Sequence, residues 1–328
     1  MRRVLKVLVL LIGTVVGLGV AAAGYMLARK PAIAPPMNVK VEMTPERIAR
    51  GQFLFNMADC DGCHSLRDFG RFGGPVVEGH RGEGVEFPKE MGLPGRVASR
   101  NITMDVETGI GAWTDGEKIR AIREGISRDG TPLFPMMPYG EFRKMSDDDV
   151  MSLVAYLNTL PPVKHAVPRS EIAFPVSVLA KSAPQPAGQV APVDSTDRLK
   201  YGEYLVTLGG CGGCHTPSEK GSPKPGMAFA GGERFQVPGA LVVSANITPD
   251  QQSGIGRWKP QDFVDKFHQY REYAEKGSPA SSPENFTLMP WLNFSRLDEE
   301  DLRAIYWYLR TQKPVYHAVD SHPGNAKK

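Results

Sequence analysis

The sequence is short of cysteine, of excess charge and of strand-like patterns. Only four of its 328 residues are cysteine, and all four fall in two short motifs. No segment alternates apolar and polar residues convincingly, which argues against a sheet-based fold. The net charge of +3 is misleading, because residues 1–30 hold five basic side chains and no acid, so residues 31–328 carry 3 − 5 = −2. A basic surface for nucleic acid is therefore not expected.

The first thirty residues form a separate segment. Val7 to Leu27 is a run of 21 residues without charge, and as a helix it would span roughly 30 Å, the thickness of the hydrocarbon core of a bilayer. Three basic side chains precede the run and two follow it, which favours an N-terminus inside and the rest outside. A cleaved signal peptide ending near Ala21-Ala22-Ala23 is the alternative, but the apolar run continues past that site. We expect a single-pass anchor in the inner membrane, with the remaining chain on the periplasmic side.

The remainder of the chain is duplicated. Cys60-Asp61-Gly62-Cys63-His64 recurs 151 positions later as Cys211-Gly212-Gly213-Cys214-His215. Further matches in the same order are Asn101-Ile102-Thr103 with Asn246-Ile247-Thr248, Gly109 to Trp113 with Gly254 to Trp258, and Met137-Pro138 with Met289-Pro290. So many ordered matches indicate gene duplication and two domains of one fold.

Each repeat has helix signals. Thr44 before Pro45 predicts one helix start, Thr114 with Glu117 a capping box, and Ser146 with Asp149 another start. We predict a mostly α fold with two tandem domains after an N-terminal transmembrane helix. The predicted divisions are an anchor (or signal peptide) 1–30, a tether 31–43, domains 44–160 and 198–318 joined by a proline-rich linker 161–197, and a tail 319–328.

The two Cys-x-x-Cys-His motifs predict two covalently bound haem c groups. Two sulfurs three residues apart lie on one side of a helical turn and can each bond a vinyl carbon, and the following histidine can then bind the iron. The predicted attachment residues are Cys60, Cys63, Cys211 and Cys214, with His64 and His215 as iron ligands. Half a zinc site, a redox dithiol or a disulfide in each motif are the alternatives, and two complete copies without a spare cysteine disfavour them.

Methionines at matched positions are the candidate sixth ligands. Met137 and Met289 lie 73 and 74 residues after the motif histidines, and each precedes a proline and an aromatic residue. A lone methionine is more often a core residue, but the duplicated placement favours ligation. Met136 competes in the first repeat, although its counterpart is Leu288. Asn101 and Asn246 are interpreted as propionate contacts or turn residues. Five further histidines have no evident counterparts and are expected to face solvent: His80, His165, His268, His317 and His322.

Residues 44–318 resemble class I cytochrome c domains. The first repeat is most similar to the cytochrome subunits of membrane-bound alcohol dehydrogenases, through Asn101-Ile102-Thr103, Thr108 to Trp113, Asp129 to Pro135 and Met137-Pro138-Tyr139. The resemblance implies haem c held by His64 and Met137, with His215 and Met289 in the same roles. It also implies electron transfer from a dehydrogenase toward quinone or a terminal oxidase. Those subunits carry three haem motifs and this chain has two, which puts membership of such a complex in doubt.

The pattern as a whole favours an electron carrier rather than an enzyme. An iron with both histidine and methionine has no position free for a substrate. The alternatives are a two-haem enzyme resembling a peroxidase, or a haem-based sensor, both of which need an open iron position. The expected partners are the inner membrane, a dehydrogenase donor and an oxidase or quinone acceptor, without nucleic acid.

Overall fold

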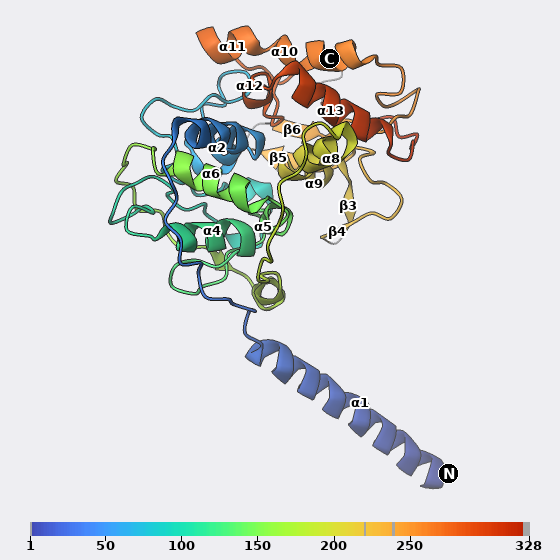
Figure 1. The fold of residues 1–328 in the computed structure, drawn as a ribbon. Coiled ribbons are helices and arrows are strands. Elements are labelled where there is room, and N and C mark those ends of the chain that lie inside the picture. The colour runs from blue at the N-terminus through green and yellow to red at the C-terminus, as the bar shows by residue number, and fades with distance from the viewer. Residues whose placement is uncertain (1, 220, 238–239, 324–328) are drawn as a thin grey trace.

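The structure is a computed structural model that describes residues 2–219, 221–237 and 240–323. Helix α1 (Arg2–Ala28) projects away from the body of the molecule in Figure 1 and contacts it at α7 (Val176–Leu179). It is long and apolar enough to cross a membrane. Two helical domains with short strands make up the body, so the predicted mostly α class with two tandem domains is confirmed. The last five residues of the predicted tail 319–328 lie outside the described residues.

The first repeat contains five α-helices, several of which begin at the predicted caps. The hydroxyl oxygen of Thr44 accepts a hydrogen bond from the Arg47 amide, and Thr114 forms the reciprocal capping box with Glu117. Ser146 accepts from the Asp149 amide. The helices are α2 (Pro45–Met57), α3 (Cys60–His64), α4 (Asp115–Glu124), α5 (Tyr139–Phe142) and α6 (Asp147–Leu157), with a 3-10 turn η1 (Lys89–Met91).

The second repeat follows the same order with one addition. Its helices are α8 (Arg198–Leu208), α9 (Cys211–His215), α10 (Pro260–His268), α11 (Arg271–Lys276), α12 (Trp291–Phe294) and α13 (Glu299–Arg310). Helix α11 has no counterpart in the first repeat. Asp298 is the N-cap residue of α13, but its side chain makes no capping hydrogen bond.

The first and last helices of each repeat cross at a glycine. A Cβ atom on Gly51 of α2 would overlap the carbonyl oxygen of Ser152 in α6, and one on Gly202 of α8 would overlap that of Ala304 in α13. Glycine at these positions therefore lets the two helix backbones touch, which is a packing role. This crossing places α3 and α9, which follow α2 and α8, in the same position in each repeat.

The strands are short antiparallel pairs. Strand β1 (Gly95–Arg96) pairs with β2 (Glu171–Ile172), β3 (Ser218–Glu219) with β4 (Ser222–Pro223), and β5 (Arg234–Val237) with β6 (Ala240–Val243). Because β2 belongs to the connector 161–197, the β1–β2 pair holds that segment against the first repeat. The connector also contains α7 (Val176–Leu179) and η2 (Ala180–Ser182). It ends near α6, where the Asp147 amide donates to the Val190 carbonyl.

One cluster of buried apolar residues runs through both repeats. Helix α8 contacts α2 and α5, and α12 contacts α2, so the second repeat packs directly on the first. A buried polar pair reinforces this interface, because the Tyr204 hydroxyl donates to the Asp149 carboxylate at 2.6 Å. The two repeats are therefore packed together rather than separated by a flexible linker.

Candidate cofactor sites

The first repeat encloses a cavity of about 450 Å³. It brings together four predicted site residues, Cys60, Cys63, His64 and Met137. The apolar part of its wall includes Ile110, Trp113, Ile122, Leu133, Phe142 and Leu153. Two thiols, an imidazole, a thioether and apolar walls are the set of groups that a haem c requires, so these residues fit that cofactor.

His64 is held as a neutral imidazole by a backbone carbonyl. Its Nδ1 lies 2.7 Å from the carbonyl oxygen of Arg100, which can only accept a hydrogen bond, so Nδ1 carries the proton. Burial lowers the pKa of His64 and keeps the ring neutral near pH 7. The Nε2 lone pair is then available to a metal.

His215 repeats this arrangement in the second domain. Its Nδ1 donates to the carbonyl oxygen of Ala245 at 2.7 Å, and burial again lowers its pKa. Ala245 immediately precedes Asn246, as Arg100 precedes Asn101. Cys211 and Met289 both pack against the hydrophobic core of this domain. The second predicted site is thus built from the same backbone elements as the first.

The methionine loops have matching turns. Pro138 (φ −80°, ψ 50°) and Pro290 (φ −76°, ψ 55°) each lie at the centre of an inverse γ-turn. The Tyr139 amide donates to the Met137 carbonyl at 2.8 Å, and the Trp291 amide to the Met289 carbonyl at 2.7 Å. Met136 also lines the first cavity but lies before the turn. The equivalent geometry supports Met137, rather than Met136, as the counterpart of Met289.

The environment of the cysteines does not favour dithiol or zinc chemistry. Burial raises the pKa of Cys63 and of Cys211 to about 12, and it also raises the pKa of Cys60 and Cys214. Reactive and zinc-binding cysteines require the thiolate, which such surroundings disfavour. Within the described ranges, no three His, Cys, Asp or Glu side chains gather around a common point. All four cysteines are free of disulfides.

The two motifs meet at the domain interface. Met57, near the end of α2, packs so closely on Gly209, after α8, that a Cβ atom there would overlap its side chain. The Asn293 side chain of the second repeat donates to Asp59, beside the first motif, at 2.7 Å. Charge on Cys214 contributes to the raised pKa of Cys63, after burial and Asp59. The two attachment sites are therefore neighbours.

The paired asparagines have a structural role. The side-chain Nδ2 of Asn101 donates to the Val163 carbonyl at 2.8 Å, and its Oδ1 accepts from the Thr103 backbone amide at 2.9 Å. Asn246 makes the same contacts with Val315 and Thr248, at 2.8 and 2.9 Å. Both side chains are buried. They tie the segment after each last helix to the loop that bears the carbonyl partner of the histidine, which favours the turn interpretation over the propionate contact.

Two histidines expected to lack counterparts are in fact equivalent. The His165 amide donates to Thr108 at 3.1 Å and its ring bonds to the Glu83 carbonyl at 3.2 Å. The His317 amide donates to Ser253 at 2.9 Å and its ring bonds to the Ala230 carbonyl at 3.0 Å. The expectation was wrong, since the two histidines are 152 residues apart, the same spacing as the two methionines.

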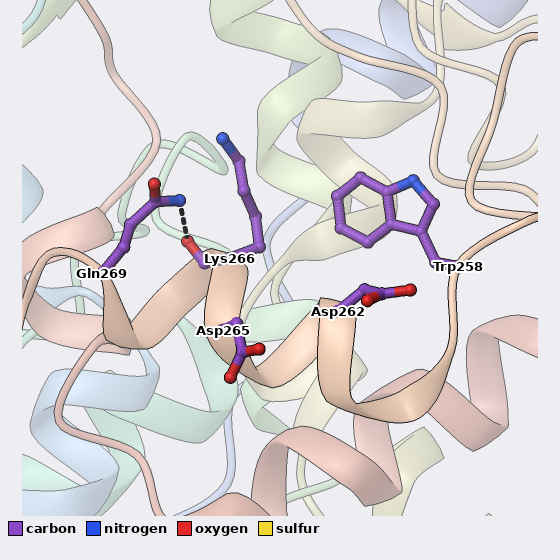
Figure 2. A pocket seen from close by; sticks show the side chains of 5 residues that line it. All are labelled: Trp258, Asp262, Asp265, Lys266 and Gln269. Atoms are coloured by element: carbon purple, nitrogen blue, oxygen red, sulfur yellow. Dashed lines mark hydrogen bonds between the residues drawn. The ribbon is translucent and has the colours of Figure 1, made fainter.

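A second hollow, of about 460 Å³, lies on the surface of α10. Figure 2 shows its five lining residues, Trp258, Asp262, Asp265, Lys266 and Gln269. The Gln269 side chain donates to the Lys266 carbonyl at 2.7 Å, and the acidic and basic side chains point in different directions. No predicted cysteine, iron-binding histidine or methionine belongs to this hollow, which we do not assign to a cofactor.

Comparison with known proteins agrees with two haem c sites, one in each repeat. A family model described as Cytochrome c matches residues 48–161 and 199–313. The diheme cytochrome c-type of Cereibacter sphaeroides is 30% identical over 303 residues, which cover 88% of this chain and 93% of that protein.

Other relatives are subunits of larger enzymes. The fructose dehydrogenase cytochrome subunit of Gluconobacter japonicus is 33% identical over 80% of this chain, and the cytochrome c subunit of the quinone alcohol dehydrogenase of Gluconobacter oxydans is 28% identical over 82%. The chain spans about half the length of these two subunits, 52% and 55% respectively. Both are therefore similar over most of this chain while being longer themselves.

Proposed function

Because this chain belongs to the cytochrome c family and carries two covalently bound haem c groups, we propose that it relays electrons between a membrane dehydrogenase and a quinone or terminal oxidase. The observation that carries the proposal is the meeting of the two Cys-x-x-Cys-His motifs at the domain interface. Adjacent redox centres are what a relay between two partners requires. Each haem, when bound, supplies a single-electron couple at its iron.

The residues of the chain hold and insulate these groups in our proposal. Cys60 and Cys63, and Cys211 and Cys214, would attach the haems, and a neutral imidazole from His64 or His215 would bind each iron. Met137 and Met289 would supply a thioether ligand to each iron. A thioether opposite histidine favours the reduced state, and the apolar walls of the first cavity keep water from its cofactor.

The donor and the membrane attachment rest on similarity and on α1. Relatives of this chain are named as cytochrome subunits of alcohol and fructose dehydrogenases, which supports a dehydrogenase donor. Helix α1 is proposed to anchor the haem domains on the periplasmic side of the inner membrane. Anchoring would hold both domains at the surface where a membrane dehydrogenase and a quinone are found.

Carbon monoxide binding tests the relay. If a histidine and a methionine both bind each iron, the ferrous protein at neutral pH should bind carbon monoxide slowly and in low yield. Met137→Ala and Met289→Ala should each open one iron to rapid binding. Rapid uptake of two equivalents by the unmutated protein would contradict the relay and favour the peroxidase or sensor alternative.

A further inference from the structure

Matched positions beside the two histidines carry different side chains. The carbonyl oxygens of Arg100 and Ala245 accept the same hydrogen bond, each at 2.7 Å from a histidine Nδ1. The backbone is thus equivalent, but one position bears a guanidinium group and the other a methyl group. Arg100 is one of the residues that line the cavity with Cys60, Cys63 and His64, and its guanidinium group lies near Asp129 and Arg169, which line the cavity too.

Other basic residues around this cavity have acidic partners. Arg169 pairs with Asp129 at 2.6 Å, Arg128 with Glu117 at 3.6 Å, and Lys118 with Asp115 at 3.6 Å. Among the residues that the structure describes, Arg100 has neither an ion pair nor a hydrogen bond from its guanidinium group to the protein. Burial and the nearby Arg169 lower the pKa of Arg100, and Asp129 offsets this in part. Arg100 is therefore the cation at this cavity that lacks an anion of its own.

Haem supplies the missing anion, because it carries two carboxylates. A guanidinium group matches a carboxylate with two parallel hydrogen bonds, which makes arginine a specific partner for it. We propose that Arg100 binds a carboxylate of the haem attached to Cys60 and Cys63, and that its charge gives this haem a higher midpoint potential than the haem of the second repeat. A cation favours the reduced state because reduction lowers the positive charge at the iron.

Acidic residues near the first motif do not reverse the proposed order of the two midpoint potentials. Asp61 is buried and ion-paired with Arg81 at 3.1 Å, which neutralises it locally. Asp59 raises the pKa of Cys63 and also that of Cys214, in both cases after burial, so its charge acts on both sites. At the matched position beside each histidine, the two sites then differ by the charge of Arg100. In the proposed relay, electrons would therefore enter at the second repeat and leave from the first.

Redox titration of the full-length holoprotein tests the inference. Arg100→Ala should lower the higher of the two midpoint potentials, with a change of about threefold to tenfold in the reduction equilibrium, where tenfold corresponds to about 59 mV. Ala245→Arg should raise the lower one by a similar factor. Arg100→Lys keeps the charge and should leave the higher midpoint potential nearly unchanged. Arg198→Ala, which removes an exposed cation on α8, should change neither midpoint potential. Haem content by pyridine haemochrome confirms two haems in each variant.

The outcomes separate this inference from the relay itself. A shift of the lower potential by Arg100→Ala would reverse the order of the haems and overturn the proposal, as would no shift at all. If Arg100→Ala loses its haem, Ala245→Arg still tests the proposal. An unchanged lower midpoint potential in Ala245→Arg would contradict the charge effect. Failure of the relay would appear instead as rapid carbon monoxide binding with both potentials behaving as expected here.

Discussion

The two repeats agree where they hold the cofactor and differ where they touch each other. The offset between matched residues is 151 at the motif cysteines, 145 at Asn101 and Asn246, and 152 at the methionines. The second repeat is therefore six residues shorter between motif and asparagine, and seven residues longer between asparagine and methionine. The helices, the histidine carbonyls and the γ-turns match despite these changes.

The segments of unequal length pack on one another. Phe72, in the longer loop of the first repeat, stacks on Tyr270 with ring centroids 5.0 Å apart. Its amide donates to the Pro279 carbonyl at 2.9 Å, and the Ser281 amide donates to the Gly70 carbonyl at 2.8 Å. The loops of unequal length thus add to the interface that the matched helices form. Duplication alone yields two sites, whereas packing of one repeat on the other places them together.

The largest loss of stability is expected from disrupting the helix crossing at a glycine that both repeats share. Gly51→Val or Gly202→Val would force apart the helices that cross there and should each cost at least about 3 kcal/mol of unfolding free energy. Urea denaturation monitored by circular dichroism measures this. Gly140→Ala, in open space on α5, is the control and should change stability by no more than about 1 kcal/mol. Equal tolerance at all three positions would show that the crossing is not as close as described.

Next in size is the loss of one axial ligand. Met137→Ala and Met289→Ala should each remove about half of the weak near-infrared sulfur–iron absorption, while Met136→Ala should leave it intact. The magnetic circular dichroism of the ferric protein measures the band. Loss of the band in Met136→Ala would shift the first ligand by one residue and break the equivalence of the two γ-turns.

Removing an interface side chain should have a smaller effect that spares both sites. Phe72→Ala deletes a buried ring and should cost about 3 kcal/mol, without altering either haem spectrum. Denaturation followed by haem absorbance and by tryptophan fluorescence should show the two repeats unfolding in separate steps. Phe174→Ala, which removes an exposed ring in the connector, is the control. Altered haem spectra in Phe72→Ala would show that the interface also shapes a cofactor site.

The smallest effect concerns the carboxylate between the motifs. Burial raises the pKa of Asp59 from 3.8 to about 6, so the folded protein holds this proton more tightly than the unfolded chain. The resulting stabilisation is complete below about pH 3.8 and is lost as the pH rises through 6, with an upper limit of about 3 kcal/mol.

Asp59→Asn removes the titrating carboxylate and so measures its pH-dependent contribution to the unfolding free energy. Asparagine tolerates the left-handed backbone of the position (φ 46°), where the second repeat has Gly210. The difference in unfolding free energy between wild type and variant, measured from pH 4 to 8, should change most steeply between the two pKa values, near pH 5, and level off above about pH 7. A difference that does not vary with pH would mean that Asp59 does not titrate in that range.

Much of the fold could be predicted because local signals and duplication agreed. The caps at Thr44, Thr114 and Ser146 act within one helical turn, so their hydrogen bonds are encoded by neighbouring residues. The equivalence of His165 and His317 was equally available from the sequence and was missed. The partners of Asn101 could not be foreseen, because Val163 lies 62 residues away and its position depends on how the chain returns after α6.

The cofactor chemistry could be predicted from the residues alone: two Cys-x-x-Cys-His motifs, two matched methionines and a resemblance to a family with covalently bound haem c. These depend on residue type and spacing, which are properties of the chain. Tertiary packing was needed to show that the two motifs adjoin, that Asp59 contacts Asn293, and that Arg100 lines its cavity without an acidic partner. These relations join residues far apart in the chain, and no local interaction encodes them.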